Sequence, residues 1–301
     1  MRNYGIITGS KQLRNVTGSW WANADFSRIE RIVYAVEHEL ATVIGNDTME
    51  WLAAGNGSGK AWLHAACAVG YMACMRYYRL NDISHQDGGR KVKIDKENEA
   101  RPFEWQLARD DRAHLEEYYR ALDRLLYELR DCDQFKATPQ YQAQQQLIIR
   151  DAITLTYLTG IDASAWLFLR LTPFLMESQR FVEKAYGQKF APDDFQLMEN
   201  TDTLKYAAQM AVALGALALM GRRTSLDTLP YGLMKVFEQD GGGNRREQAP
   251  LDRLNDYLKQ LSKEQHYWLN EMRTLRDHEV DNECTYLQMP ENHPNDKFMR
   301  L

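Results

Sequence analysis

The sequence predicts an all-α protein, a multi-helix bundle that carries one small β-hairpin and an extended C-terminal tail. Two observations predict this fold class. Apolar residues recur at spacings of three and four along much of the 301-residue chain, which is the period of an amphipathic helix. Only one stretch, near residues 82–95, alternates apolar and polar residues around an Asp-Gly-Gly turn, as two paired strands do.

The longest periodic stretch runs from residue 101 to residue 133 and predicts the central helix of the bundle. Pro102 suits its first turn, because the N–H that proline lacks would have no helical partner there. The apolar face of this helix consists of Leu115, Tyr118, Leu122, Leu125 and Leu129. A helix of this length needs several others to cover it, so we expect it to organise the fold.

The chain before the central helix predicts three further helices. Residues 1–24 are expected to be irregular, because glycines interrupt any period. A helix then begins at an N-cap, Asp25 or Ser27, and ends at Gly45-Asn46, and a short helix follows from Asp47. The third helix covers residues 58–80.

The loop before that third helix resembles a phosphate-binding loop, from Ala54 to Gly59-Lys60. We reject this interpretation for two reasons. The preceding chain predicts a helix and not a buried strand, and the residue after Lys60 is Ala61, where Ser or Thr would be needed to hold Mg²⁺.

The chain after the central helix predicts a helix from Thr138-Pro139 that ends at Gly160. The next helix begins at Asp162 or Ser164, is kinked or divided at Pro173, and ends at Tyr186-Gly187. A short helix at 192–199 and an apolar helix at 201–220 are expected to follow. No internal repeat is evident. The expected division is a helical body at 1–220, a loop-rich insertion at 221–247, a long helix at 248–279 and an extended tail at 280–301.

Composition excludes several classes of function. The net charge of −5 is unlike that of a free-standing nucleic-acid binder, which is usually basic. The most apolar run, residues 206–220, contains Gln209 and is shorter than the roughly 20 residues that a membrane span needs, so we expect a buried helix and no membrane. The four cysteines include no CxxC pair, and we expect all of them to be reduced.

No motif for catalysis or for a cofactor is found. The chain lacks H-E-x-x-H, a nucleophile elbow and a glycine fingerprint after a strand. His64 and Cys67 lie one helical turn apart, but two ligands do not make a metal site. We therefore expect a protein that is not an enzyme and holds no cofactor or metal.

Three groups of residues are candidates for contact with a partner. The returning arm of the hairpin is basic, and so is the end of the insertion. The tail combines two prolines with sizeable apolar residues, which suits an extended peptide that docks in a groove, on its own subunit or on a neighbour. The candidates are Arg90, Lys91, Lys93, Arg245, Arg246, Tyr286, Met289, Phe298 and Leu301.

Segments 25–52 and 92–129, with the helical part that follows to about residue 219, resemble a family of proteins encoded in prophages of gut bacteria. Members look like virion structural proteins, and the helical opening is similar to the head–tail connector (adaptor) proteins of long-tailed phages. The resemblance implies a homo-oligomeric ring at the portal, contacts with portal or other neck proteins, and non-specific contact with packaged DNA. It also implies a place in the virion neck, after assembly in the host cytoplasm.

Two other classes of function stay open. A nucleic-acid-handling helical protein would bring Arg90, Lys91, Lys93, Arg245 and Arg246 onto one basic surface, and its DNA binding would depend steeply on salt. A helical enzyme or small-molecule binder without a recognisable motif would need an apolar pocket in which polar groups converge.

Overall fold

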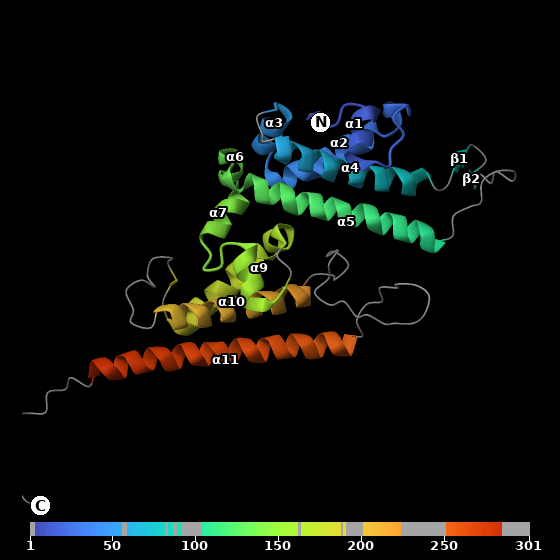
Figure 1. The fold of residues 1–301 in the computed structure, drawn as a ribbon. Helices are drawn as coiled ribbons and strands as arrows, with labels where there is room; N and C mark the ends of the chain where they lie inside the picture. The colour runs from blue at the N-terminus through green and yellow to red at the C-terminus, as the bar shows by residue number, and fades with distance from the viewer. Residues whose placement is uncertain are drawn as a thin grey trace, which may run out of the picture.

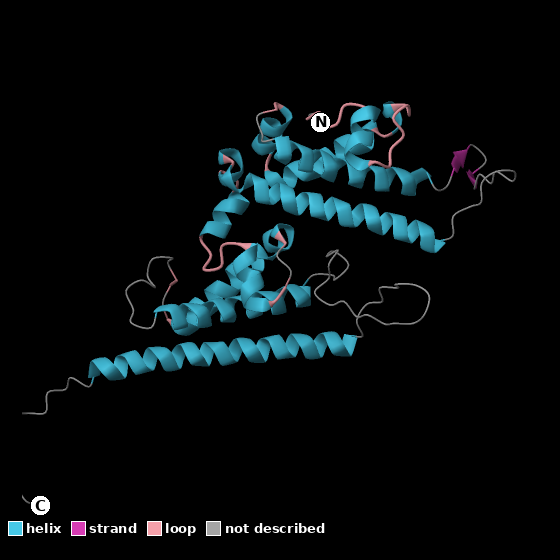
Figure 2. Cartoon of the chain, in the orientation of Figure 1, coloured by secondary structure: helices cyan, strands magenta, loops and turns pink. Residues whose placement is uncertain are grey.

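A computed structural model describes residues 4–55, 59–81, 84–86, 89–91, 104–161, 164–187, 189–190, 201–223 and 251–284. Side chains are described throughout these ranges except at 84–86, 89–91, 104, 201, 251–253 and 276–284. The described part of the chain is almost entirely helical, which confirms the all-α class (Figure 2).

The elements fall in two runs, which meet between residues 136 and 139. The first run is α1 (Ser10–Thr17), the 3₁₀ helix η1 (Phe26–Arg28), α2 (Glu30–Ile44), α3 (Asn46–Ala53), α4 (Gly59–Asn81), β1 (Ser84–Gln86), β2 (Gly89–Lys91), α5 (Glu104–Glu128), the 3₁₀ helix η2 (Leu129–Asp131) and α6 (Asp133–Lys136). The second run is α7 (Pro139–Gln145), α8 (Ala152–Thr159), α9 (Ala165–Tyr186), α10 (Thr201–Arg223) and α11 (Leu251–Cys284).

The long helices form one row, in the order α2, α4, α5, α9, α10 and α11, and each contacts the next (Figure 1). The strands β1 and β2 pair antiparallel, with Ser84 opposite Lys91. The rest of the predicted hairpin at 82–95 lies outside the described residues.

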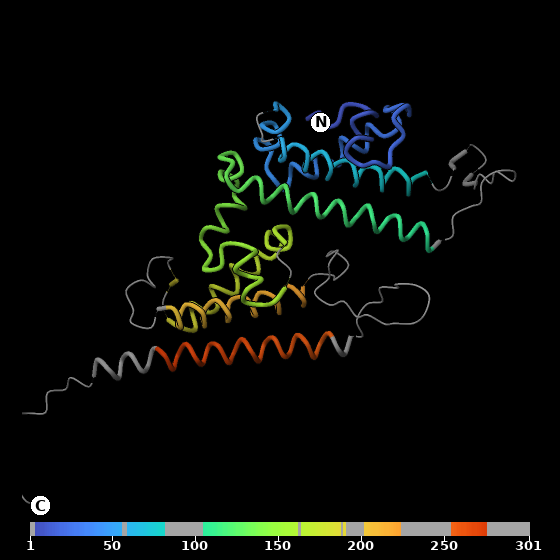
Figure 3. The backbone as a smooth tube through the Cα atoms, in the orientation of Figure 1, coloured from blue at the N-terminus to red at the C-terminus, as the bar shows by residue number. Residues whose placement is uncertain are grey.

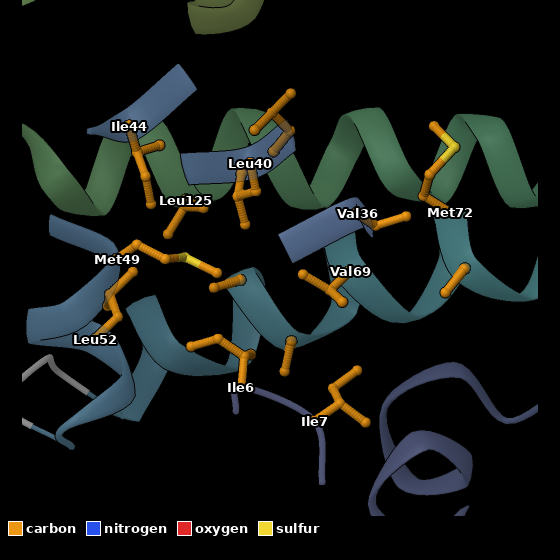
Figure 4. Close-up of a cluster of buried hydrophobic side chains, with 14 of the residues drawn as sticks. Ile6, Ile7, Val36, Leu40, Ile44, Met49, Leu52, Val69, Met72 and Leu125 are labelled. Atoms are coloured by element: carbon orange, nitrogen blue, oxygen red, sulfur yellow. The ribbon is translucent and has the colours of Figure 1, made fainter. Parts of the chain in front are cut away.

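Buried side chains form two clusters. The N-terminal cluster takes its fully buried members from residues 6–135 and includes Leu122, Leu125 and Leu129 of the predicted central stripe. Figure 4 shows part of it, where Leu125 of α5 lies among side chains of α2, α3 and α4. The C-terminal cluster takes its members from residues 147–272, on α8 to α11.

The structure corrects the prediction that residues 1–24 are irregular. Residues Ser10 to Thr17 form α1, and the glycines that seemed to interrupt it are its boundaries. Gly9 is the extended N-cap residue, and Gly18 ends the helix at φ 69°, a left-handed conformation that favours glycine. Leu13 is buried and Ser10 nearly so, which holds this mostly polar helix on the body.

The helix predicted from Thr138 to Gly160 is two helices, α7 and α8. The backbone N–H of Ile148, between them, donates to Oε1 of Gln179 on α9 at 2.9 Å. Asp151 then begins a new helix, since its carboxylate accepts from the N–H of Thr154 at 2.7 Å. A tertiary hydrogen bond and a new N-cap therefore interrupt a pattern that looked continuous.

Three boundaries also differ from the prediction. Helix α9 runs through Pro173 as one helix, so the predicted division there is wrong, while the alternative of a kink stays a prediction. Helix α5 gives way to the 3₁₀ turn η2 at Leu129, before the predicted end at 133. Helix α11 continues to Cys284, so the segment 280–301, predicted to be extended, begins as helix, and its remainder lies outside the described residues. The expected helix at 192–199 and nearly all of the insertion at 221–247 also lie outside them.

The structure further reveals an internal repeat, which the sequence did not make evident. Helices α1 and α8 have eight residues each and end at Gly18 and Gly160, 142 positions apart, both at φ 69°. Helices α2 and α9 end at Gly45 and Gly187, again 142 apart, at φ 88° and 90°. Helices α4 and α10 have 23 residues each and begin 142 positions apart.

Side-chain hydrogen bonds repeat with the same spacing. The hydroxyl of Thr17 donates to the carbonyl of Leu13 at 2.9 Å, and that of Thr159 donates to the carbonyl of Leu155 at 2.7 Å. The N–H of Ile6 donates to Glu37 Oε1 at 2.9 Å, just as Ile148 donates to Gln179, 142 positions further on. The chain therefore contains one structural unit twice, a first unit at residues 4–131 and a second unit at residues 146–284.

The order of helices is the same in both units. Helix α4 packs between α2 and α5 in the first unit, and α10 packs between α9 and α11 in the second. In the tube of Figure 3 the second set follows the first along the row, so that α5 of the first unit meets α9 of the second. We call this contact the inter-unit joint.

Candidate interaction surface

The residues predicted to contact a partner are not among the described side chains. Arg90 and Lys91 lie on β2, where only the backbone is described. The other seven, Lys93, Arg245, Arg246, Tyr286, Met289, Phe298 and Leu301, lie outside the described residues. A shared basic surface and a docking tail thus stay predictions, and the surfaces below come from other parts of the chain.

The polar part of the inter-unit joint is a carboxylate of the first unit at the start of α9. Oδ1 of Asp123, on α5, accepts from the backbone N–H of Trp166 at 2.8 Å and from the hydroxyl of Ser164 at 2.9 Å. Ser164 is itself the N-cap of α9 and accepts from the N–H of Leu167 at 3.0 Å. Donors at the start of α9 are therefore satisfied partly from within the second unit and partly from the first.

Burial raises the pKa of the Asp123 carboxyl above its ordinary value, while its hydrogen bonds with Trp166 and Ser164 act in the opposite direction. The two donors, with the N-terminus of α9 behind them, are the groups that stabilise the partly desolvated charge. The two units can therefore meet at the joint in only a narrow range of positions, because a displaced carboxylate would stay buried and lose these hydrogen-bond donors.

The apolar part of the joint is aromatic. The rings of Tyr119 on α5 and Trp166 on α9 lie 6.4 Å apart between centroids, and the guanidinium of Arg170 lies 5.7 Å from the Trp166 ring. Trp166 and Leu169 are partly buried against the N-terminal cluster, although they belong to the second unit. The two units are therefore joined by a continuous apolar contact and not by polar groups alone.

The equivalent surface of the first unit is the segment before α2, residues 19–28, which we call the entry segment. It lies 142 positions before residues 161–170, and the hydrogen bonds that hold Ser19 and Ala24 come from α1, α4 and α5 of its own unit. Trp21 in this segment is 77% exposed. A tryptophan so exposed is a candidate anchor for a protein contact.

The backbone around Trp21 is held in place, so its exposure is not that of a loose end. The N–H of Ala24 donates to the carbonyl of Trp21 at 3.0 Å, and the hydroxyl of Ser10 donates to the carbonyl of Ala24 at 2.6 Å. The indole N–H of Trp20 donates to the same Ser10 hydroxyl at 3.1 Å. The Tyr78 hydroxyl of α4 donates to the carbonyl of Ser19 at 2.8 Å.

The other end of the row is the outer face of α11. Leu258, Leu261, Leu269 and Met272 are buried in the C-terminal cluster. The opposite side of the helix is exposed at Lys259, Lys263, His266, Tyr267, Asn270 and Arg273. Tyr267 is 57% exposed, and its ring lies 5.3 Å from that of Trp268. The two ends of the row are thus unlike surfaces, and each carries an exposed aromatic side chain.

One cluster of polar side chains has the composition of a nucleophile with a base, and the sequence did not indicate it. Nε2 of His114 lies 3.3 Å from the Ser19 hydroxyl, and Nδ1 lies 3.0 Å from the backbone carbonyl of Asp110. The Asp110 carboxylate is further away, at 3.6 Å, and 61% exposed. The carbonyl is therefore the closer partner of Nδ1, and the cluster holds the entry segment on α5.

The described side chains include three thiols and several imidazoles, which are potential ligands or nucleophiles. The described residues contain no group of three or more His, Cys, Asp or Glu that could hold a metal ion. Burial lowers the pKa of His64 and raises that of Cys67, whose thiol lies 3.6 Å from the carbonyl of Val16. Cys67, Cys74 and Cys132 are free thiols, and burial raises the pKa of Cys74 to about 11. The thiols of Cys67 and Cys74 are therefore poor nucleophiles at neutral pH.

One described helix is long and apolar enough, by length and composition, to span a membrane: α10, from Asp202 to Arg223. Most of its apolar stretch is buried against α9 and α11. Ala207 and Ala211 are buried in this packing, and a Cβ on Gly215 would lie 2.1 Å from Nε2 of Gln265 on α11.

No protein-family model, no curated protein and no solved structure matches the chain.

Proposed function

We propose that this chain is a structural protein of a phage virion, a head–tail connector that assembles as a ring at the portal and acts by assembly and not by catalysis. The observation that carries the proposal is the row of helices with unlike exposed ends, the entry segment and the outer face of α11. A ring of identical copies requires such heterologous contacts, in which one surface meets a different surface of the next copy. The resemblance of residues 25–52 and 92–129 to prophage-encoded virion proteins supports the same function.

Two finer features belong to this proposal. The hairpin near residues 82–95 would project from the ring, with Arg90, Lys91 and Lys93 towards a neck protein or packaged DNA. The tail, residues 285–301, would dock in extended form on a neighbouring copy or on the portal through Tyr286, Met289, Phe298 and Leu301. Extended peptides gain affinity from a few such apolar anchors.

Two measurements test the proposed function. Mass spectrometry of purified virions of the phage that encodes the chain should detect it at a fixed ratio to the portal protein. Cryo-electron microscopy of the same virions should place its density below the portal, in the neck. Absence of the chain from purified virions would refute the proposal, whatever the purified protein does in solution.

A salt series separates the connector from a nucleic-acid-handling protein. Binding of the purified chain to duplex DNA should be weak at physiological salt if DNA is touched only inside an assembled neck. Tight binding by the free chain, with a steep loss of affinity as salt rises, would favour the nucleic-acid alternative.

A further inference from the structure

The inter-unit joint shows how one copy of the structural unit meets the next. The last long helix of the first unit, α5, receives the start of the first long helix of the second unit, α9, through the Asp123 hydrogen bonds and the Tyr119–Trp166 contact. The joint pairs two unlike surfaces, and each unit has one surface of each kind. The joint occupies one such pair within the chain, so one surface of each kind is left over.

The unused pair consists of the two ends of the row. Helix α11 holds the place in the second unit that α5 holds in the first, because each packs along the 23-residue helix of its own unit. The entry segment holds the place in the first unit that the start of α9 holds in the second. Both are exposed in the described structure, at Tyr267 and at Trp21.

We propose that copies of this chain associate head to tail, with the outer face of α11 of one copy receiving the entry segment of the next, in the manner of the inter-unit joint. The partner is thus a second copy of this chain. The inference rests on the proposed function only for the assumption that copies assemble, and it goes beyond that function by naming how the two surfaces pair. Trp21 and Tyr267 are the exposed aromatic side chains of the two surfaces. They do not take the positions of Trp166 and Tyr119, since Ala24 stands 142 positions before Trp166 and Leu261 stands 142 positions after Tyr119.

The repeat argues for this occupant over others. The outer face of α11 and the entry segment hold the places that α5 and the start of α9 hold at the joint, so a second copy continues the row of helices in the same order. A two-fold dimer would pair like surfaces, α11 with α11 or entry segment with entry segment, and the inter-unit joint pairs unlike ones. Repetition of the joint gives a chain of units with a constant step, which closes into a ring where its rotation allows.

Cross-linking of the full chain tests the surfaces directly. A mixture of unlabelled and ¹⁵N-labelled protein, treated with a lysine-reactive cross-linker, distinguishes links between copies from links within one. Lys11 on α1 adjoins Ser10, which bonds the entry segment, while Lys259 and Lys263 lie on the outer face of α11. We expect mixed-label links from Lys11 to Lys259 or Lys263.

Substitutions supply the second arm. Trp21→Ala and Tyr267→Ala should each weaken self-association, measured by sedimentation over a concentration series, by about tenfold or more, as for the loss of a central aromatic anchor. Tyr157→Ala is the matched control, because Tyr157 on α8 is 84% exposed and belongs to neither surface. It should leave association unchanged. Far-UV circular dichroism should show that all three variants remain helical.

The outcomes separate this inference from the proposed function. Mixed-label links confined to other surfaces, or association that survives both Trp21→Ala and Tyr267→Ala, would overturn the head-to-tail surfaces and leave the connector proposal standing. A chain that forms no links between copies would also overturn them. If the expected cross-links form but the protein is absent from virions, the head-to-tail surfaces are supported and the connector function is refuted.

Discussion

Glu37 of α2 is a buried carboxylate whose removal should release the N-terminal segment. It is fully buried, and its Oε1 accepts from the N–H of Ile6 at 2.9 Å and of Ile7 at 3.2 Å. Its Oε2 accepts from the N–H of Gly5 at 3.2 Å. Ile6 and Ile7 are themselves fully buried in the N-terminal cluster. The carboxylate thus holds a segment without regular structure against the core.

Glu37→Ala leaves these three backbone donors without their acceptor. Each buried donor left unpaired costs about 1–3 kcal/mol. The Gly5 donor is only partly buried and can find water, so the two buried donors, of Ile6 and Ile7, should lower the free energy of unfolding by about 2–6 kcal/mol. Glu37→Gln is the matched control. Gln179 occupies the equivalent position of the second unit and accepts from Ile148 with its amide oxygen. The amide retains the Ile6 and Ile7 bonds, so its effect should stay within about 1 kcal/mol.

The pH dependence distinguishes the carboxylate from the amide. Burial raises the pKa of Glu37 above its ordinary value of 4.5, and this effect exceeds the opposing effect of the backbone hydrogen bonds. The folded state therefore binds the proton more tightly than the unfolded state does. The stability gained from this is complete below pH 4.5 and is lost as the pH rises through the pKa of the folded protein. Wild type should thus gain stability relative to Glu37→Gln as the pH falls from neutral towards about 4.5.

The free energy of unfolding of wild type, Glu37→Ala and Glu37→Gln is measured by urea unfolding, followed by far-UV circular dichroism. Each protein is measured at neutral pH and near the ordinary pKa of a glutamate. Equal stability of Glu37→Ala and Glu37→Gln would show that the segment is not held by this side chain. A difference between wild type and Glu37→Gln that does not change with pH would show that the carboxylate is not desolvated.

Three further substitutions test the packing. Asp123→Ala should destabilise the protein by about 1–3 kcal/mol, because two donors of the joint lose their acceptor. Asp123→Asn keeps an oxygen at this position and should cost less stability. Equal losses of stability in urea unfolding would refute the role of the acceptor. Gly70→Ala places a Cβ 2.7 Å from Cγ2 of Thr17 and should lower the free energy of unfolding by about 1–3 kcal/mol. An unchanged melting temperature would show that α1 moves aside without cost. Leu122→Asp buries a charge at a position that is fully buried and should abolish cooperative thermal unfolding; a retained transition would place Leu122 at the surface.

The class of the fold could be predicted from the sequence because periodicity is a local property. Leu122, Leu125 and Leu129 recur with the helical period and are all fully buried. Leu80 continues the apolar spacing of α4 but is 60% exposed near the end of that helix. Periodicity thus identified the helix but not which of its apolar positions are covered.

The break between α7 and α8 could not be predicted in this way. Leu147, Ile148 and Ile149 continue a helical pattern, and the reason for the break is the hydrogen bond from Ile148 to Gln179, far along the chain. Such a bond becomes visible only when α9 is in place. Helix α1 was missed for a local reason, since glycines at both of its ends were interpreted as interruptions and not as boundaries.

The repeat was missed because few residue identities survive between the units. Core positions keep their burial but not their residue type, as at Val33 and Leu175 or at Leu40 and Val182. The signal that would have revealed it is a short pattern, Ile6-Ile7 with Thr17-Gly18, which recurs at Ile148-Ile149 with Thr159-Gly160. Ile6 and Ile148 donate to equivalent positions on α2 and α9, and the hydroxyls of Thr17 and Thr159 make equivalent bonds. The joint, and with it the candidate interaction surface, could not be found without the repeat.

The two units differ most where each meets its neighbour, and the difference bears on how copies assemble. The start of α9 takes part of its hydrogen bonding from Asp123 of the other unit. The entry segment is hydrogen-bonded within its own unit. The carboxylate of Asp25 accepts from the N–H of Ser27 at 3.0 Å and from its hydroxyl at 2.7 Å. These Ser27 donors keep their acceptor in the free chain, and the contact offered to a neighbour is mainly the exposed Trp21. A joint of this kind can form after folding and can separate again, whereas the joint inside the chain must form for α9 to be fully capped.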